Sequence, residues 1–352
     1  MKKYLIVLFT VFLLLMVAAC GNSEKVDSES NGQDDGSAEF EEVEITFSHN
    51  QPIESPEHVG AEKFKEIVEE KTGGKVKVNV FPASQLGSLR EQVEGTQLGE
   101  INITMQPTAV VTPFVDDIKV IDLPYLWPPS NEQTYKVLDG EVGQELLGTL
   151  EKGGFKGLGY WPGGFKLFTT GDKEVHKPED FKGMTMRVME SPLLIEQYKT
   201  WGATAIPVPY AEVYNSLQQG VVDGQENPLQ TIFLNNYHEV QKNVIDSYHG
   251  TMTYVLMANQ DWFNGLSEDL QNVLLEAEVE GHTAARQALA EVEDEYRQKI
   301  IDSGINYYKL TDEEIEAFRS VSREMHKEVY NKPDQLEMLD KLYKAIDEAG
   351  SN

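Results

Sequence analysis

The sequence predicts an α/β fold in which parallel strands alternate with helices. Apolar residues with a period of two, typical of strands, are repeatedly followed by helix caps and helical spacing. This alternation runs from residue 43 to residue 105 and recurs from residue 155 to residue 258. Strand–helix repeats of this kind imply layers of helices packed on sheets with parallel strands.

The first part of the chain contains five expected elements. Val43, Ile45 and Phe47 alternate with polar residues, which predicts a strand that begins at Val43. Ser55 and Pro56 form a typical N-cap and first turn of a helix. The other elements are a strand over residues 76–80, a helix that starts at the capping box of Ser88 and Glu91 and ends at Gly99, and a strand over residues 101–105.

The second part repeats the pattern. Strands are expected over residues 155–160, 166–170, 184–189, 205–208 and 251–258, and helices over 191–202 and 209–219 and from Asn227 onward. A helix capped by Ser267 extends to about Ile301. Because it is longer than either half of such a chain needs, we expect it to cross between two lobes. Thr311 and Glu314 predict another capped helix.

The N-terminus has the features of a secretion signal. Lys2 and Lys3 precede an almost continuous apolar run, and small residues lie directly before Cys20. Small residues before a cysteine resemble a bacterial lipobox, in which the thiol is lipidated after residues 1–19 are removed. The alternative is an uncleaved anchor. With either arrangement the rest of the chain lies outside the cytoplasmic membrane and is held at its surface.

Composition limits the possible partners. Residues 20–42 combine the anchor cysteine with an acidic, Ser/Gly-rich stretch that predicts a flexible tether. Removing residues 1–19 takes away two of the 30 basic side chains and none of the 59 acidic ones, so the charge falls from −29 to −31. So acidic a surface argues against nucleic acid as a partner, although local cations in a cleft can still bind a small anion.

Arg187 is the best candidate for binding such an anion. It lies near the carboxyl end of the predicted strand 184–189, and Ser191 begins a helix four residues later. Ligands of open α/β sheets bind at this edge, where helix N-termini point their N–H groups. A guanidinium there suits a carboxylate because it is planar, always charged and bidentate. The alternative is an arginine paired with a surface acid.

Three further residues have weaker signals. Asn227 can donate its amide to a ligand, or it can simply cap the helix that Pro228 begins. Tyr210 lies at a helix start, where it can line a cleft or belong to the core. Lys166 follows Gly163 and Gly164, which permit close backbone approach, but most lysines are only solvated.

No catalytic motif stands out. The seven histidines include no H-E-x-x-H pair, so no metal site is expected. The sequence lacks a nucleophile elbow, a P-loop and a dinucleotide fingerprint, so no cofactor is expected either. A secreted hydrolase with paired carboxylates remains an alternative because acids are abundant.

Residues 178–228 resemble one family. The stretch reads P-E-D-F-K-G-M-T-M-R-V-M-E-S-P and later W-G-A-T-A-I-P-V-P-Y-A-E-V-Y-N-S-L-Q-Q-G-V-V-D-G-Q-E-N-P. It is similar to the extracytoplasmic substrate-binding subunits of TRAP (tripartite ATP-independent periplasmic) transporters of the DctP type. F-S-H-N, G-K-V-K-V-N-V-F-P-A-S-Q-L-G and D-L-P-Y-L-W fit the same family in the same order, so the resemblance covers residues 43–350.

The resemblance implies a two-lobed, periplasmic-binding-protein-like α/β fold with a hinge, which closes on a small organic acid. We assign residues 43–164 and 253–292 to lobe 1, and residues 165–252 and 293–352 to lobe 2. In the family the arginine of the R-V strand clamps the ligand carboxylate, and the asparagine of Q-E-N-P supports it. These residues are Arg187 and Asn227.

Further ligand contacts are implied in the same way. Asn50, Gln106 and Tyr210 fall where family members line the cleft, and backbone N–H groups at Ser191 assist the clamp. Lys166 falls where some relatives carry a second arginine. Gln106 replaces a glutamate of sialic-acid binders, which argues against that ligand. The sequence around residues 224–249 favours a C4-dicarboxylate, with a uronate or other sugar acid as the alternative.

The resemblance also implies partners. The loaded protein would deliver its ligand to the small and large membrane subunits of a TRAP permease, for uptake driven by an ion gradient. It would act without catalysis.

Overall fold

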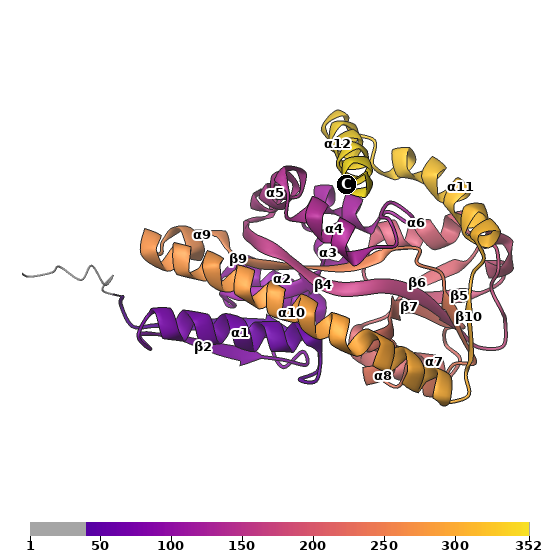
Figure 1. Cartoon of the computed structure of the whole chain (residues 1–352), viewed down its shortest axis with the longest axis horizontal. Helices are drawn as coiled ribbons and strands as arrows, with labels where there is room; N and C mark the ends of the chain where they lie inside the picture. The colour runs from indigo at the N-terminus through magenta and orange to yellow at the C-terminus, as the bar shows by residue number, and fades with distance from the viewer. Residues whose placement is uncertain (1–39, 352) are drawn as a thin grey trace, which may run out of the picture. The chain divides into compact units, whose positions relative to one another are not determined.

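The computed structural model describes residues 40–351 (Figure 1). The signal peptide, Cys20 and most of the tether lie outside the described residues. Within 40–351, no helix is both long enough and apolar enough to cross a membrane.

The strands of the described region form one mixed sheet, and the predicted α/β class is confirmed. Its main order is β2-β1-β3-β9-β4-β7-β5-β6, with β8 beside β4 and β10 beside β8. β1 pairs in parallel with β2 and β3, and β5 with β6 and β7, whereas β9 and β4 are antiparallel to their neighbours. The strand bounds are β1 Val43–His49, β2 Val76–Phe81, β3 Ile103–Pro107, β4 Phe155–Thr170, β5 Thr185–Val188, β6 Thr204–Pro207, β7 Gly224–Pro228, β8 Asn243–Asp246, β9 Thr251–Asn259 and β10 Asn306–Lys309.

Strand β4 belongs to both halves of this sheet. Its residues 155–165 pair with β9, and its residues 166–170 pair with β7. We call β2, β1, β3, β9 and the first part of β4 the first half-sheet, and the remaining strands the second half-sheet. The prediction of two separate strands was wrong, because Gly163 and Gly164 form an irregularity within a continuous strand and do not end it.

Five of the twelve α-helices in residues 40–351 begin at predicted caps, namely Ser55, Ser88, Ser191, Ser267 and Thr311. Ser55 accepts a hydrogen bond from the His58 N–H, and Ser88 with Glu91 forms the expected capping box. The predicted helix 209–219 is divided into a 3₁₀ turn, η4, over Tyr210–Glu212, and the short helix α7. The helix bounds are α1 Pro56–Lys71, α2 Leu89–Leu98, α3 Thr108–Val111, α4 Asn131–Leu138, α5 Glu141–Gly148, α6 Pro192–Thr200, α7 Val213–Gln218, α8 Leu229–Leu234, α9 Gln260–Asn264, α10 Glu268–Asp302, α11 Asp312–Val329 and α12 Pro333–Gly350; further 3₁₀ turns are η1 Asp116–Asp122, η2 Thr149–Gly153, η3 Pro178–Phe181 and η5 Tyr237–Glu239.

Helix α10 is the long helix that the sequence predicts. It lies beside α1 near its N-terminus, crosses β4, and reaches α8 and β10 (Figure 1). It therefore contacts elements of both half-sheets. Gly60 of α1 and Gly281 of α10 allow the close approach, because a Cβ at Gly60 would lie 2.6 Å from the Gly281 carbonyl and 2.5 Å from Trp161.

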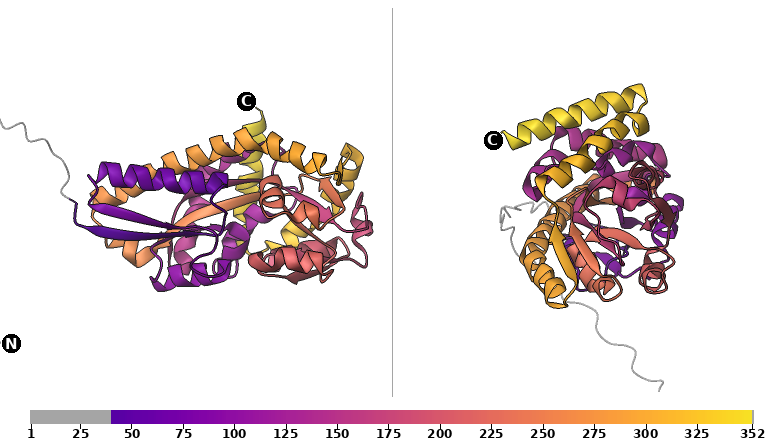
Figure 2. Two further views of the ribbon diagram at one scale, coloured as in Figure 1. Left: turned by 90° about the horizontal axis from the view of Figure 1, so that it is seen from below. Right: turned by 90° about the vertical axis from the view of Figure 1, so that its right-hand side faces the viewer.

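The C-terminal helices return to the first half of the chain. α12 packs on α4 and α5, and α11 packs on α6 (Figures 1 and 2). The segment assigned to lobe 2 thus also contacts helices assigned to lobe 1. The exact lobe boundaries stay a prediction.

Candidate ligand-binding site

Arg187 lies in β5, between the parallel strands β6 and β7. Only 2% of the residue is exposed. Its Nε and Nη2 both donate to the carbonyl oxygen of Val208, at 3.1 and 2.9 Å. This carbonyl fixes the plane of the guanidinium and leaves Nη1 without a hydrogen-bond partner among residues 40–351.

The charge of Arg187 has no counter-ion in the described part of the chain, where no carboxylate lies within 4.0 Å of it. Burial lowers the pKa of Arg187, although an arginine stays protonated in proteins. Buried charges in proteins are normally paired. The alternative of an arginine paired with a surface acid is therefore wrong.

A small cavity borders Arg187. Its wall is formed by residues of both halves of the chain: Ser88, Leu89, Arg90, Val110, Arg187, Met189, Glu190, Val208, Pro209 and Tyr210. Its volume of about 20 Å³ is enough for one water molecule but far below the roughly 300 Å³ of ligand pockets. Arg90 of α2 reaches Glu190, just beyond β5, at 3.7 Å. This ion pair joins the two sides of the cavity.

Asn227 lies on the same face of the sheet as Arg187. Arg187 is directly opposite Gln225 in the parallel ladder, and Asn227 is two residues further along β7. The Asn227 amide donates to the Gln225 side chain. Because β7 continues to Pro228 and α8 begins at Leu229, the interpretation of Asn227 as a helix cap is wrong.

Lys166 lies on the opposite face. It alternates with Leu167, which is the residue opposite Asn227 in the β4–β7 register. Its ammonium group pairs with Glu226 Oε1 at 2.6 Å. Gln197, Tyr198 and His249 also bond to Glu226. Burial alone would raise the pKa of Glu226, but Lys166 and His249 outweigh it and hold this pKa well below its usual range.

Of the other predicted site residues, Asn50, Gln106 and Ser191 are buried, and Tyr210 is partly buried. Asn50 follows β1, Gln106 lies in β3, and Ser191 precedes α6. Asn50 Oδ1, Gln106 Oε1 and Ser191 Oγ have no hydrogen-bond partner among the described residues. The Tyr210 hydroxyl accepts a hydrogen bond of 2.7 Å from Asn235.

Sequence reasoning missed two buried acids near these residues. Glu226 is part of the quoted Q-E-N-P motif, but nothing local indicates that Lys166 is its partner. Glu57 occupies the first turn of α1, where an acid is usual on solvent-exposed helices. Its position therefore suggested an exposed acid, and no local signal indicated that Glu57 is buried.

Comparisons with known proteins identify the family. The chain matches the family described as bacterial extracellular solute-binding protein, family 7 (DctP), over residues 47–333, and it belongs to that family. The C4-dicarboxylate-binding periplasmic protein DctP of Rhodobacter capsulatus is 36% identical over 291 residues, which cover 82% of this chain and 87% of the relative.

Two solved structures have the same fold. A TRAP periplasmic solute-binding protein from Sulfurospirillum deleyianum with bound succinate is 33% identical, with a TM-score of 0.80, and 88% of this chain and 99% of that chain are covered. One from Anaerococcus prevotii with bound D-glucuronate is 31% identical, with a TM-score of 0.82 and coverages of 88% and 98%.

These matches confirm the predicted class. The chain is an extracytoplasmic solute-binding protein with a two-lobed α/β fold, and it is not an enzyme. The hydrolase alternative is therefore wrong. Proteins of the DctP family bind small acid anions and work with TRAP permeases.

Proposed function

We propose that this protein captures a small organic acid between its two lobes and that Arg187 clamps the ligand carboxylate. The single observation that supports the clamp is the burial of Arg187 without a counter-ion among the described residues. A ligand carboxylate would supply the missing charge and bind bidentately. Asn227, on the same face, would donate its amide to the same ligand. The start of α6 would contribute backbone N–H groups and Ser191 its unpaired hydroxyl, since the N–H of Ser191 itself donates to the Met189 carbonyl.

The free energy of one buried charge pair is a large part of the free energy that micromolar binding requires. Micromolar binding requires about −8 kcal/mol. Removing one partner of a desolvated charge pair typically costs about 2–5 kcal/mol. One buried guanidinium can therefore decide whether binding is measurable.

Capture requires a hinge motion. The cavity of about 20 Å³ at Arg187 cannot admit an organic acid, so the lobes must separate for entry and close again. The residues on either side of the cavity come from the first and second halves of the chain, as an interlobe site requires.

Two ligand classes remain. A C4-dicarboxylate is the expectation from sequence, and a uronate or another sugar acid is the alternative. One observation favours the sugar acid: Lys166, the second buried cation, is already neutralised by Glu226 on the other face of the sheet. Arg187 is then the one buried cation with free capacity in the described region, which suits a ligand with one carboxylate.

Delivery follows from the class. We expect the loaded, closed form to dock on the membrane subunits of a TRAP permease, with a lipid on Cys20 holding the protein at the outer face of the membrane. Productive delivery requires that the permease bind the closed state more tightly than the open one. Uptake in vesicles should follow an ion gradient, and a requirement for ATP hydrolysis would contradict this assignment.

Mass spectrometry of the mature N-terminus would detect the diacylglyceryl group, and a cleaved, unmodified Cys20 would exclude it.

A thermal-shift screen with organic acids tests the binding function. A binder is stabilised by about 2.7 kcal/mol when the ligand is present at a hundred times its Kd. Succinate, malate, D-glucuronate and D-galactonate should be tested at millimolar concentration and recovered afterwards. We expect stabilisation by at least one acid and chemically unchanged ligand. Stabilisation that persists fully in Arg187→Ala would contradict the clamp.

A further inference from the structure

Glu57 is a second functional candidate. The residue is 0% exposed, and its Oε1 accepts a hydrogen bond from the Gln230 amide. Glu57 belongs to α1 and Gln230 to α8, so this contact joins the two halves of the chain. Oε2 has no hydrogen-bond partner among the described residues.

The groups around Glu57 share one chemical property. Asn50 Oδ1, Gln51 Oε1 and Gln230 Oε1 are also buried oxygens without a hydrogen-bond donor in the described region. Asn50 and Gln51 follow β1, at the same edge as the start of α1. Leaving a buried acceptor unsatisfied is costly, and here several acceptors occur together. A ligand that donates several hydrogen bonds would satisfy these acceptors together.

Two tyrosines, the partly buried Tyr210 and the buried Tyr254, lie between this acceptor group and Arg187 in their electrostatic interactions. The pKa of Tyr210 is raised by burial; the charge of Glu57 raises it further, and the charge of Arg187 lowers it. Tyr210 also lines the cavity at Arg187. Tyr254, which receives a hydrogen bond from Gln51, lies within the electrostatic reach of both Glu57 and Tyr210. Tyr210 therefore lies within the electrostatic reach of both Glu57 and Arg187.

We propose that Glu57 is a specificity-determining residue that accepts hydrogen bonds from hydroxyl groups of the ligand, so that the site selects a polyhydroxylated monocarboxylic acid. This inference rests on the proposed carboxylate clamp at Arg187. The carboxylate of the ligand binds Arg187, and its hydroxyl groups donate to Glu57 and to the amide oxygens of Asn50, Gln51 and Gln230.

Above its raised pKa, Glu57 disfavours the simpler ligand. At such a pH the second carboxylate of a C4-dicarboxylate would meet the carboxylate of Glu57 and would find acceptors where it needs donors. The ligands are therefore compared at a pH above 7. Lys166 is unavailable to it because that ammonium is paired with Glu226. The ammonium group of an amino acid has its donors at one position. Hydroxyls on successive carbons can reach acceptors directly after β1, in α1 and in α8. A hydroxylated acid therefore fits the site better than an amino acid.

Calorimetry with three acids tests the proposal. D-galactonate and hexanoate have the same number of carbons and one carboxylate each, and they differ in their hydroxyl groups. Succinate has two carboxylates and no hydroxyl. We expect the unmodified protein to bind D-galactonate at least about tenfold more tightly than hexanoate or succinate. Equal or tighter binding of succinate would overturn the proposal, and this comparison needs no variant.

The variant Glu57→Gln tests the residue itself. We expect it to weaken D-galactonate binding by about 10- to 100-fold and to leave succinate binding unchanged or stronger. Glu66→Gln, an exposed position on the same helix, is the matched control and should change neither affinity. An equal effect of Glu57→Gln on both acids would overturn the specificity role.

The two proposals fail separately. If Arg187→Ala abolishes acid binding but Glu57→Gln changes nothing, the clamp stands and the role of Glu57 is wrong. If Arg187→Ala leaves D-galactonate and succinate binding intact, the clamp is wrong and the role of Glu57 falls with it.

Discussion

The Lys166 ammonium lies 2.6 Å from Glu226, and the two side chains are only 0% and 2% exposed. Lys166 belongs to the part of β4 that enters the second half-sheet, and Glu226 belongs to β7. Because His249, Gln197 and Tyr198 complete the coordination of Glu226, this ion pair is satisfied within the protein. It leaves Arg187 on the other face as the buried cation without a counter-ion.

Removing Lys166 should destabilise the protein strongly. Lys166→Met leaves Glu226 as a buried charge without its counter-ion, at a cost of about 3–5 kcal/mol. Chemical denaturation would measure this loss in the free energy of unfolding. Lys199→Met, at an exposed pair with Glu196, is the control and should cost less than about 1 kcal/mol. The double variant Lys166→Met with Glu226→Gln should recover part of the loss, and no recovery would show that the two residues are not coupled.

Arg187 should be indispensable for ligand affinity. We expect Arg187→Ala to weaken acid binding by roughly 30- to several-thousand-fold, since the ligand carboxylate would lose its counter-ion in a site without water. Arg187→Lys should also fail because an ammonium cannot reproduce the bidentate geometry. Calorimetry measures both effects, with Arg319→Ala at the surface as the control. A change of less than fivefold in Arg187→Ala would contradict the clamp.

Glu57 should make the stability of the ligand-free protein depend on pH. Burial raises its pKa from 4.5 to about 7, so the folded state binds this proton more tightly than the unfolded state does. The contribution of Glu57 to stability is therefore most favourable below pH 4.5 and is lost as the pH rises through 7. Glu57→Gln removes this penalty and should be more stable than the unmodified protein at pH 8, by up to about 3 kcal/mol, with the difference vanishing near pH 4.5. A constant difference across this range would contradict the burial of an ionisable Glu57.

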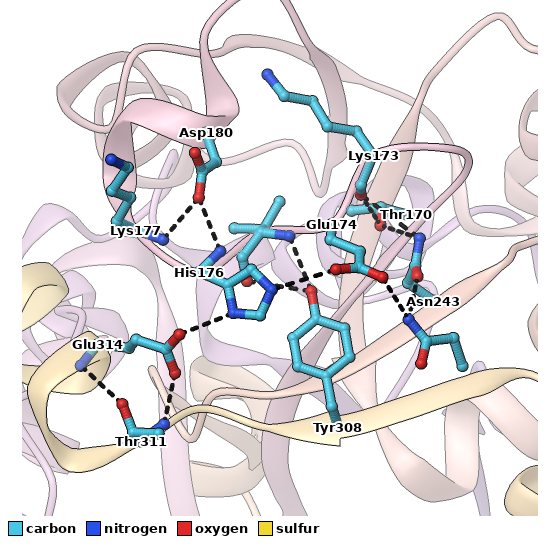
Figure 3. Close-up of polar contacts among 12 residues, drawn as sticks. Thr170, Lys173, Glu174, His176, Lys177, Asp180, Asn243, Tyr308, Thr311 and Glu314 are labelled. Carbon is cyan, nitrogen blue, oxygen red and sulfur yellow. Dashed lines mark hydrogen bonds and ion pairs between the residues drawn. The ribbon is translucent and has the colours of Figure 1, made fainter.

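His176 should contribute a second pH dependence, which has a different cause. The folded state favours the charged form of His176, whereas it disfavours the charged form of Glu57. Figure 3 shows its ring between Glu314 and Glu174, at 2.8 and 3.4 Å, and the ring also stacks on Tyr308 of β10. Burial lowers the pKa of His176, but the hydrogen bonds to the two carboxylates outweigh it and raise this pKa. The stabilisation is therefore complete below pH 6.5 and is lost as the pH rises through the raised value.

The variant His176→Gln isolates this contribution. We expect it to lower the melting temperature at pH 5.5 and to have no effect at pH 9. The effect should be small, below about 1 kcal/mol, because the ring is 43% exposed and solvent screens the pairs. A loss of equal size at both pH values would show that the stacking on Tyr308, and not the charge, is responsible.

Local signals in the sequence predicted most of the fold. The caps at Ser55, Ser88 and Thr311 are satisfied by short-range hydrogen bonds, so they can be read from neighbouring residues alone. The errors arose where tertiary pairing decides the outcome. β4 continues through Gly163 and Gly164 because β9 pairs with it on both sides of them. Asn227 stays in a strand because β4 lies beside it.

The site was predicted only in part. Position near a strand end indicated Arg187 and, more weakly, Asn227, and resemblance to a family supported both; the register places them on one face of the sheet. The pairing of Lys166 with Glu226, and the burial of Glu57 against Gln230, join residues 60 and 173 positions apart. No periodicity or spacing encodes such contacts, because each half looks like an ordinary charged residue of its own segment.

The continuity of β4 limits how this protein can open. A strand that is hydrogen-bonded in both half-sheets cannot slide, so any rotation of one lobe against the other must be taken up as twist or bending within that strand. The pairing changes partners between Phe165 and Lys166, directly after the two glycines. We therefore expect the pivot of the movement to lie next to Lys166, so that the same few residues would set both the range of movement and the position of the buried Lys166–Glu226 ion pair.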